Sequence, residues 1–428
     1  MSLDVYLHGK LIGGLFQTGE HGYRLAYRPE TVEEVGAGEV LLSSSLPARE
    51  EPFGADASRA YVEGLLPQGQ RRHAIAAELG LDPDDGYGLI AALGRDCPGA
   101  VVFLGQGEDH EPSDAGPLTW LSDDELEQLL QPRPVGLADG PHGRGMHFTL
   151  PGERHKLALV RDAENGRWAW PRPDAPSTHI LKPESAERRG LVANEMTCTL
   201  AYRELGLPVT HVAVETIAGQ TCLVSKRFDR WGDGPGAERL HQESFAQALG
   251  IAPPPATAVG SSRQGETPDL AESCGLLRAI GEEHGAHTLM SAAFCDLVIG
   301  NCAARGANAA LLFTGDGPIL APIFGIAATE IYGAERRRPP VIDAPPAPFL
   351  VDIRRTAWEC DFEFQPALME AIETMARTCS SLNTVIDRAR EEGWYSRVAD
   401  EALQCATERS IGFRDEIEYL RPRGGEAL

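Results

Sequence analysis

The most constraining feature of the sequence is a series of short strand patterns with a single helical pattern inserted among them. The expected strands are His155 to Asp162, Trp168 to Pro171, Ile180 to Pro183, Val212 to Ile217 and Cys222 to Phe228. Asn165-Gly166 and Ala218-Gly219 are typical hairpin turns between them. Gly190 to Glu204, between the third and fourth strands, has helical periodicity. This order predicts a mostly antiparallel sheet with one inserted helix.

Other patterns extend β structure towards the N-terminus and helical structure towards the C-terminus. Residues 3 to 16 alternate in polarity around His8-Gly9-Lys10, which predicts a hairpin. Ala60 to Leu79 predicts a helical pair, Ala100 to Leu104 a strand, and Leu121 to Leu130 a helix. After Trp231 the pattern predicts helices, interrupted by a long loop at Pro253 to Pro268.

Loop signals divide the chain into four segments. Glycine, proline and acidic residues concentrate in Gly105 to Pro117 and in Gly136 to His147. We therefore expect an N-terminal β domain at 1–106, a helical linker at 107–140, a β-rich part at 141–235 and a helical part at 236–428. A chain of 428 residues is too long for one compact core, which agrees with several packed units.

Composition narrows the class of protein. With 42% hydrophobic and 24% charged residues, the chain is globular. A formal net charge of -24 disfavours direct binding to nucleic acid and suits a basic partner. The nine cysteines form no CxxC pair, so neither a disulfide framework nor a zinc site is indicated. No signal peptide or membrane-spanning stretch is evident, so we expect a cytoplasmic protein without membrane association.

Several sequence blocks spread along the chain match the pattern of one known family. The blocks in the first part are Leu42-Ser-Ser-Ser-Leu-Pro47, Glu63-Gly-Leu-Leu-Pro67 and Gly94-Arg-Asp-Cys-Pro-Gly-Ala-Val101. Those that follow are Thr178-His-Ile-Leu-Lys182, Asn194-Glu195, Lys226-Arg-Phe-Asp-Arg230 and His241-Gln-Glu-Ser-Phe-Ala-Gln-Ala-Leu-Gly250. In order and spacing these blocks resemble the HipA family of bacterial serine/threonine kinase-fold toxins. The resemblance implies an α+β, bilobal protein-kinase-like fold with an N-terminal small β domain and a helical C-terminal lobe.

On the nucleotide side of the site, the resemblance assigns some residues and weakens others. Lys182 matches the lysine that contacts ATP, and Glu195 could pair with it; a surface ion pair is the alternative. The segment Thr149 to Lys156 stands at a phosphate-contacting loop of which only Gly152 and Lys156 fit well. Its Glu153 would repel a phosphate.

Three further positions belong to this side. Thr149 keeps a hydroxyl where the family has a phosphorylatable serine, which leaves modification by another kinase open. Glu243 and Phe245 fall where the family contacts adenine, although Phe245 could simply be a core residue.

On the catalytic side, the sequence keeps the spacing of the family pattern but lacks its functional residues. Ile299 to Asn308 follows the family pattern Ile-Gly-Asn-Thr-Asp-x-His-x-Lys-Asn and keeps Asn308. Ala303 stands at the catalytic Asp, Arg305 at the His and Ala307 at the Lys. Alanine cannot accept a proton or orient a hydroxyl, so the resemblance implies that phosphate transfer is lost.

The metal-binding element is altered as well. Leu320 to Ile326 matches Leu-x-Pro-Phe-Tyr-Asp and puts Gly325 at the Asp that binds magnesium. Three nearby acids could act as replacements in principle, although solvated surface groups are commoner. These acids are Asp296, Asp316 and Glu330. Cys302, beside Ala303, suggests thiol chemistry, yet no histidine in the loop could activate it.

The leading hypothesis is therefore a HipA-like pseudokinase that acts by binding a protein partner, with binding of ATP and magnesium doubtful. One alternative is a kinase-fold enzyme whose altered loop supports another transfer or lyase reaction, with Arg305 on an anionic substrate. The other is an active serine/threonine kinase toxin. The resemblance implies a HipB-like DNA-binding antitoxin as the partner.

Overall fold

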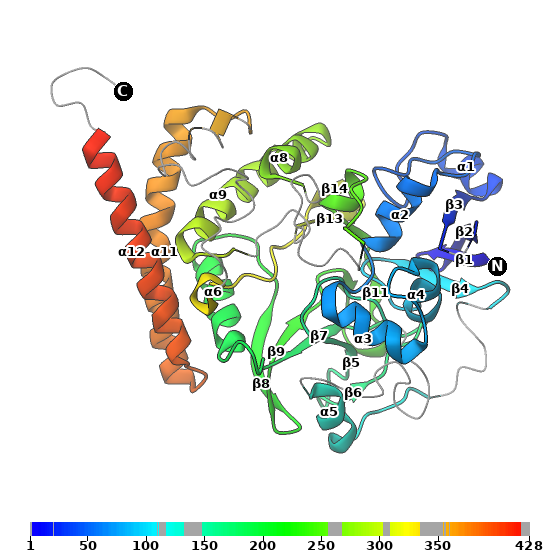
Figure 1. The fold of residues 1–428 in the computed structure, drawn as a ribbon, viewed down its shortest axis with the longest axis horizontal. Coiled ribbons are helices and arrows are strands. Elements are labelled where there is room, and N and C mark those ends of the chain that lie inside the picture. Colours follow the sequence, from blue (N-terminus) through cyan, green and yellow to red (C-terminus); the bar gives the residue numbers. More distant parts are fainter. Residues whose placement is uncertain are drawn as a thin grey trace. The chain divides into compact units, whose positions relative to one another are not determined.

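The computed structural model describes residues 2–19, 21–108, 110, 117–131, 148–255, 268–302, 309–333, 354, 357–358 and 360–420. The chain forms two compact units and passes between them several times (Figure 1). Unit 1 contains Met1–Pro183, Glu215–Thr267 and Ala310–Ala321. Unit 2 contains Glu184–Val214, Pro268–Ala309 and Pro322–Leu428.

Unit 1 begins with a four-stranded antiparallel sheet in the order β3-β2-β1-β4. Its strands are β1 (Ser2–Leu7), β2 (Lys10–Gln17), β3 (Tyr23–Tyr27) and β4 (Val101–Gly105). The β1–β2 turn has positive φ at His8 (49°) and Gly9 (74°), as the right-handed twist of a tight hairpin requires. The predicted hairpin and the strand near Ala100 are confirmed.

Four helices accompany this sheet. They are α1 (Pro29–Val35), α2 (Ala55–Glu63), α3 (Gly69–Leu79) and α4 (Gly86–Leu93). The pair α2–α3 confirms the helical pattern predicted at Ala60 to Leu79. The chain turns sharply between them, and α3 ends at Gly80 in the left-handed conformation that closes helices.

A second, five-stranded sheet of unit 1 has the order β6-β5-β7-β9-β8. Its strands are β5 (Leu157–Arg161), β6 (Trp168–Ala169), β7 (His179–Pro183), β8 (Val212–Ile217) and β9 (Gln220–Lys226). Helix α5 (Asp123–Leu130) precedes them, and α6 (Leu191–Glu204) lies between β7 and β8 in the chain. The predicted strand, strand, strand, helix, strand, strand order is confirmed.

A single hydrophobic core connects the two sheets of unit 1. It runs without interruption from Leu3 and Val5 of β1 to Leu157 and Leu159 of β5 and Val224 of β9. The N-terminal sheet is therefore packed as part of unit 1, because its apolar face has no separate core of its own.

Short strands also occur in the part of the chain that was expected to be helical. They are β11 (Glu238–Arg239), β12 (Gln242–Ser244), β13 (Ala310–Thr314) and β14 (Gly317–Leu320). The partner of β11 is β10 (Arg230–Trp231), which ends the β-rich part. The last three strands form a sheet in the order β12-β13-β14, and α7 (Phe245–Ala248) follows β12. The expectation of helices after Trp231 was wrong in these segments, because β12 pairs with β13 across more than sixty residues and a local pattern does not report such a pairing.

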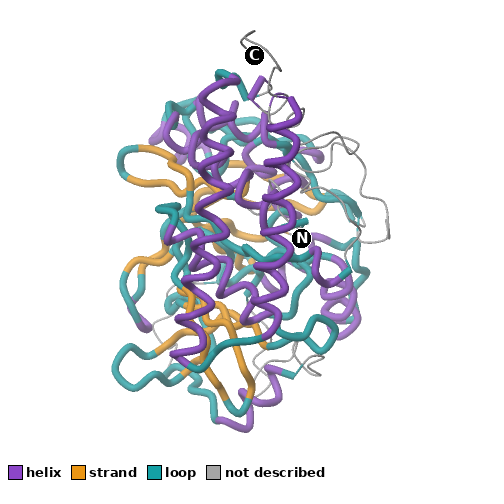
Figure 2. The backbone as a smooth tube through the Cα atoms, turned by 90° about the vertical axis from the view of Figure 1, so that its left-hand side faces the viewer, coloured by secondary structure: helices purple, strands orange, loops and turns teal. Residues whose placement is uncertain are grey.

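Unit 2 is built mainly of helices. They are α6, α8 (Leu270–Ala279), α9 (Glu283–Ile299), α11 (Phe364–Glu392) and α12 (Arg397–Leu420), with a short 3-10 helix η4 (Glu330–Tyr332). Figure 2 shows α11 and α12 side by side. Apolar side chains of these helices are buried: Met290 and Phe294 of α9 are at most 1% exposed, and Ala371 of α11 is fully buried.

A buried ionic network holds together sequence blocks that are far apart in unit 1. The Asp96 carboxylate accepts hydrogen bonds from Arg230 (3.0 Å), Arg239 (2.6 Å) and Ser177. Arg227 forms a two-pronged pair with Asp229, whose carboxylate also accepts from the Gly99 amide at 2.6 Å. All these charged groups are under 9% exposed. Buried charges are tolerated only when paired in this way.

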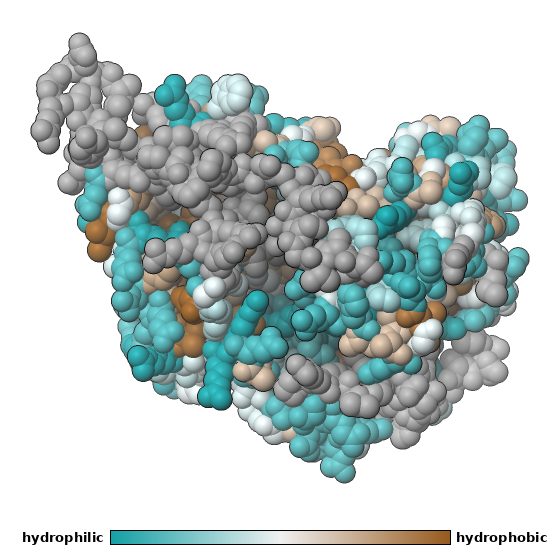
Figure 3. All heavy atoms as spheres, viewed as in Figure 1, coloured by the Kyte–Doolittle hydropathy of each residue, from teal (hydrophilic) through white to brown (hydrophobic). Residues whose placement is uncertain are grey.

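The surface agrees with the acidic composition. In Figure 3 hydrophilic side chains gather over α5, whose first turn carries Asp123, Asp124 and Glu125. Acidic residues in a first helical turn also stabilise the helix, because they oppose its positive end. Within the described ranges, no helix combines the length and apolarity needed to cross a membrane.

Candidate functional site

The segment corresponding to the phosphate-contacting loop is tied to the N-terminal part of unit 1. The Arg71 guanidinium donates to the carbonyls of Leu150 (2.7 Å) and Lys156 (3.3 Å). The Gln68 amide donates to the Gly152 carbonyl at 3.3 Å. Gly152 has φ of 93°, which favours glycine over other residues. Helix α3 and the residue before it therefore set the course of this loop.

The two candidate lysines lie at the same end of the five-stranded sheet. Lys156 precedes Leu157, which pairs with Leu181, the neighbour of Lys182. The Lys156 ammonium donates to the Pro151 carbonyl of its own loop. The sheet thus brings the loop and Lys182 together, with one ammonium engaged by the loop itself.

Thr149 lies inside unit 1. It is fully buried, and its amide donates to the Asp96 carbonyl at 3.0 Å. Its side chain lies beside the buried Cys97 thiol, and their interaction lowers the pKa of that thiol against the larger, opposite effect of burial. Modification of Thr149 by another kinase would require this segment to open, so that idea remains a prediction.

The predicted Lys182–Glu195 pair also stays a prediction. Lys182 belongs to unit 1, whereas Glu195 belongs to unit 2. Glu195 is on α6 and only 5% exposed.

Glu243 and Phe245 are buried in unit 1, at 1% and 0% exposure. The Glu243 carboxylate accepts from the Ser44 amide (3.0 Å) and hydroxyl (2.7 Å), which belong to the block Leu42 to Pro47. Burial raises the pKa of Glu243 above its usual value, and the Ser43 and Ser44 hydrogen bonds oppose this. The Ser244 amide donates to Gln247 at 2.9 Å, which leaves it unavailable to a base. The side chains at these positions bind the protein itself.

The C-terminal end of α9 is organised around Asp296. One oxygen of its carboxylate accepts hydrogen bonds from the Tyr202 hydroxyl and the Asn301 side-chain amide, both at 2.8 Å. The Asn301 backbone amide donates to the Asp296 carbonyl at 3.0 Å, and Gly300 ends the helix in the left-handed conformation. Burial raises the pKa of Asp296 to about 7, against the effect of the two hydrogen bonds.

Replacing Asp296 by asparagine is expected to stabilise unit 2 at pH 8 and to have little effect at pH 4. A raised carboxyl pKa means that the folded state binds the proton more tightly, so stability falls as the pH rises through about 7. Asparagine does not titrate, so the variant should not show the loss of stability that the unchanged chain shows between pH 4 and pH 7. Thermal unfolding across this range measures the effect; an unchanged pH profile would contradict it.

The segment that carries Gly325 lies directly against this helix end in unit 2. The Cys302 amide donates to the Thr329 hydroxyl at 2.8 Å, and the Glu330 amide donates to the Gly300 carbonyl at 3.1 Å. Gly325 has φ of 70°, and no atom of the described residues lies within 4 Å of the place a β-carbon would occupy. The two elements expected to hold catalytic and metal-binding groups are therefore adjacent.

The side chain of Asn194 on α6 fixes the same segment. It is fully buried, donates to the Ala328 carbonyl at 3.0 Å and accepts from the Ala328 amide at 2.9 Å. The backbone amide and carbonyl of buried Ala328 are therefore both hydrogen-bonded to the Asn194 side chain, as they would be to a neighbouring strand.

Two of the three candidate replacement acids are not solvated surface groups. Asp296 is engaged as described, and Glu330 pairs with Arg409 of α12. Arg409 also donates to the Leu297 carbonyl at 2.9 Å, near the negative end of α9. Only Asp316 is exposed, at the β13–β14 turn of unit 1. Tyr202 and Arg409 come from distant segments and were not predictable, whereas Asn301 lies only five residues after Asp296.

The structure bears on thiol chemistry at Cys302 and on metal binding. Burial raises the pKa of Cys302, although Arg409 and the Thr329 hydrogen bond act in the other direction, so the thiolate is disfavoured at neutral pH. No group of three or more potential metal ligands occurs among the residues that the structure describes. Ala303, Arg305, Ala307 and Asn308 lie outside the described residues, and their roles stay predictions.

Several residues of this site were not singled out by sequence reasoning. Tyr202, Thr329 and Arg409 organise the helix end through hydrogen bonds. Asn194 was noticed only as part of a block that resembles the family. A buried polar residue inside a helix full of apolar neighbours is a usable signal, because it must find a partner.

Comparison with known proteins agrees with this architecture. A family model described as the HipA N-terminal domain matches residues 3–104, and one described as the HipA-like C-terminal domain matches residues 148–398. A protein of Sinorhizobium fredii named "Putative kinase Y4mE" is 33% identical over 339 residues, 77% of this chain and 78% of the relative. The serine/threonine-protein kinase toxin HipA of Shewanella oneidensis is 23% identical over 284 residues, 64% of this chain and 63% of the toxin.

A solved structure shares the fold. It is the complex of HipA, HipB and operator DNA from Shewanella oneidensis, of which one chain matches with a TM-score of 0.77 at 20% identity. The match covers 98% of this chain and all of that chain. With both family models matched and a relative above 30% identity, the chain belongs to the HipA family of kinase-fold proteins.

Proposed function

We propose that this member of the HipA family is a pseudokinase that acts by binding a protein partner and does not transfer phosphate. The observation that carries the proposal is that Gly325, which the resemblance puts at the metal-binding Asp, has no described atom within 4 Å of its β-carbon position, while the nearby described acids Asp296 and Glu330 are held by other residues. Ala303 at the position of the catalytic Asp supports it from the sequence. Removing one such contribution typically lowers a rate by about 10² to 10⁴.

The described acids give magnesium little to bind. Asp296 is held by Tyr202 and Asn301, and Glu330 by Arg409. Magnesium in kinase-like sites depends on one or two carboxylates together with the phosphates. The described acids near Gly325 therefore do not fit a magnesium ion.

The phosphate-contacting segment also supports binding without transfer. Its carbonyls accept from Arg71 and Gln68, and Lys156 donates back to Pro151. An ammonium that is already hydrogen-bonded must exchange that bond for one to a phosphate, which reduces the net gain.

The partner that suits this chain is a small basic DNA-binding protein of the HipB kind. The chain carries a net charge of -24, and acidic residues mark the first turn of the exposed helix α5. The structural relative was solved together with HipB and operator DNA. Co-expression with the product of an adjacent gene tests this; recovery of the chain alone, at low salt, would count against such a partner.

Incubation of the purified chain with labelled ATP and magnesium is expected to show no transfer to the chain or to a protein substrate. Magnesium should not increase its affinity for ATP in isothermal titration. Robust magnesium-dependent phosphorylation would overturn the proposal and favour an active kinase.

A matched pair of variants refines this experiment. Gly325→Asp restores a carboxylate where no atom obstructs it, and aspartate tolerates the left-handed backbone better than most residues. It should make ATP binding magnesium-dependent, whereas Gly325→Asn, which has the same shape and also tolerates the left-handed backbone but carries no charge, should not. Equal behaviour of the two variants would show that the missing carboxylate is not what limits metal binding.

A further inference from the structure

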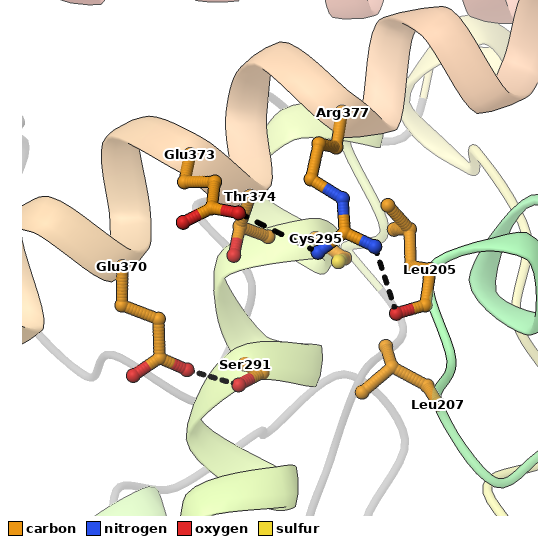
Figure 4. A pocket seen from close by; sticks show the side chains of 8 residues that line it. All are labelled: Leu205, Leu207, Ser291, Cys295, Glu370, Glu373, Thr374 and Arg377. Atoms are coloured by element: carbon orange, nitrogen blue, oxygen red, sulfur yellow. Dashed lines mark hydrogen bonds and ion pairs between the residues drawn. The ribbon is translucent and has the colours of Figure 1, made fainter.

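Unit 2 contains a small pocket of about 150 Å³ that none of the preceding roles uses (Figure 4). It lies between α9, α11 and the loop after α6. Ligand pockets for drug-sized molecules are typically about 300–1,000 Å³. This pocket is therefore too small for a nucleotide and suits a group of a few heavy atoms.

One wall of the pocket is apolar. Leu205 and Leu207 come from the loop after α6, and Cys295 comes from α9. Cys295 is 1% exposed, and burial raises the pKa of its thiol to about 12, so it is an uncharged wall at neutral pH. Such a wall favours methylene groups of a ligand.

The charged side chains of the pocket do not balance. Arg377 donates to the Leu205 carbonyl at 3.3 Å and lies 3.8 Å from Glu373, one turn earlier on α11. This leaves Glu370, whose carboxylate accepts a hydrogen bond from the neutral Ser291 hydroxyl. No basic side chain pairs with Glu370 in the part of the chain that the structure describes. One uncompensated carboxylate therefore borders the apolar wall.

From this arrangement we infer that the pocket binds a primary alkylammonium group. The ammonium donates to the Glu370 carboxylate, and its methylene chain lies against Leu205, Leu207 and Cys295. A carboxylate supplies a charge-assisted hydrogen bond, and Arg377 disfavours any ligand with a bulky second cationic centre. The same chemistry is presented by a free aliphatic amine and by a lysine side chain. The inference does not depend on whether the chain transfers phosphate.

Titration with n-butylammonium chloride, followed through the methyl NMR signals of Leu205 and Leu207, tests the inference. We expect saturable shifts with a Kd on the order of a few millimolar, because only one ion pair and a short chain contribute. n-Butanol at constant ionic strength should bind at least about tenfold more weakly, since it lacks the charge.

Two variants on α11 separate a specific site from general attraction to an acidic protein. Glu370→Gln should weaken n-butylammonium binding about tenfold, with the methyl spectrum otherwise unchanged. Glu391→Gln removes an exposed carboxylate of the same helix outside the pocket and should leave binding unchanged. Equal losses in the two variants, equal binding of butanol, or shifts that never saturate would each overturn the inference.

A second ligand distinguishes the two possible sources of the ammonium group, which are a free aliphatic amine and a lysine side chain. Nα-acetyl-lysine methylamide carries the ammonium on a peptide side chain. Binding as tight as that of n-butylammonium assigns the pocket to a lysine of a protein, whereas binding of n-butylammonium alone assigns it to a free amine. Failure of both ligands rejects the site, and neither result bears on the pseudokinase proposal.

Discussion

Asp96→Asn is expected to destabilise unit 1 by about 3–5 kcal/mol, the typical cost of breaking a buried ion pair from one side. Asparagine keeps the shape of the side chain but leaves Arg239 without a carboxylate partner and Arg230 with Asp229 alone. Both guanidinium groups are buried, so water cannot replace the lost partner. Chemical denaturation followed by the fluorescence of the buried Trp170, which lies in unit 1, measures the change.

A surface carboxylate provides the control. Asp233 pairs with Lys226 at 2.6 Å, and its side chain is 57% exposed. Asp233→Asn should change stability by less than about 1 kcal/mol, because exposed pairs contribute little. If Asp96→Asn lowered the free energy of unfolding by as little as Asp233→Asn, the buried network would not stabilise the fold of unit 1.

The pH dependence of the same network has a definite sign. Burial by itself would raise the pKa of Asp96, but Arg239, Arg230 and Arg227, together with Ser177, hold it at about 2. A lowered pKa gives stability that is present above the unfolded value of about 3.9 and is lost as the pH falls towards 2. Asp96→Asn should therefore flatten the acid limb of the stability profile between about pH 4 and pH 2.

Asn194→Ala is expected to destabilise unit 2 by about 2–4 kcal/mol, since it leaves the buried amide and carbonyl of Ala328 without partners. The effect should concentrate in the segment that contacts the end of α9. Hydrogen exchange at the amides of Ala328 and Glu330 should become faster, while exchange in the strands of unit 1 should not change.

An exposed amide serves as the comparison for Asn194. Gln404 on α12 is exposed. Among the described residues, its side-chain amide donates one hydrogen bond, to Glu408. Gln404→Ala should have an effect below about 0.5 kcal/mol. Slow exchange that persists at Ala328 in Asn194→Ala would show that the segment is held by other contacts.

Much of the fold follows from local patterns in the sequence. The hairpin around His8 and Gly9, the order of the strands from β5 to β9 and the inserted helix α6 follow from apolar patterns and turn residues that lie close together in the sequence. The three-stranded sheet β12-β13-β14 escaped prediction because β12 and β13 are separated by more than sixty residues. Pairing between such distant segments depends on tertiary packing, which a local pattern does not report.

The contacts of the family blocks did not follow from the sequence. Glu243 stands where the family contacts adenine, and the structure adds that its carboxylate binds Ser44 of another block. Asp296 and Glu330 were considered solvated, yet Tyr202 and Arg409 reach them from other helices. In each case the partner lies more than thirty residues away, so no spacing rule could have identified it.

By itself, the sequence determined the order of the strands and helices, the acidic charge and the residue types at the positions that the family resemblance assigns to catalysis and metal binding, since these depend only on identity and local periodicity. The tertiary structure alone decided which polar residues pair. Asp96 with its three arginines, Asn194 with Ala328 and Glu370 beside an apolar wall exist only once distant segments meet. Burial makes each of these pairings necessary, because a polar group removed from water must find its partner inside the protein.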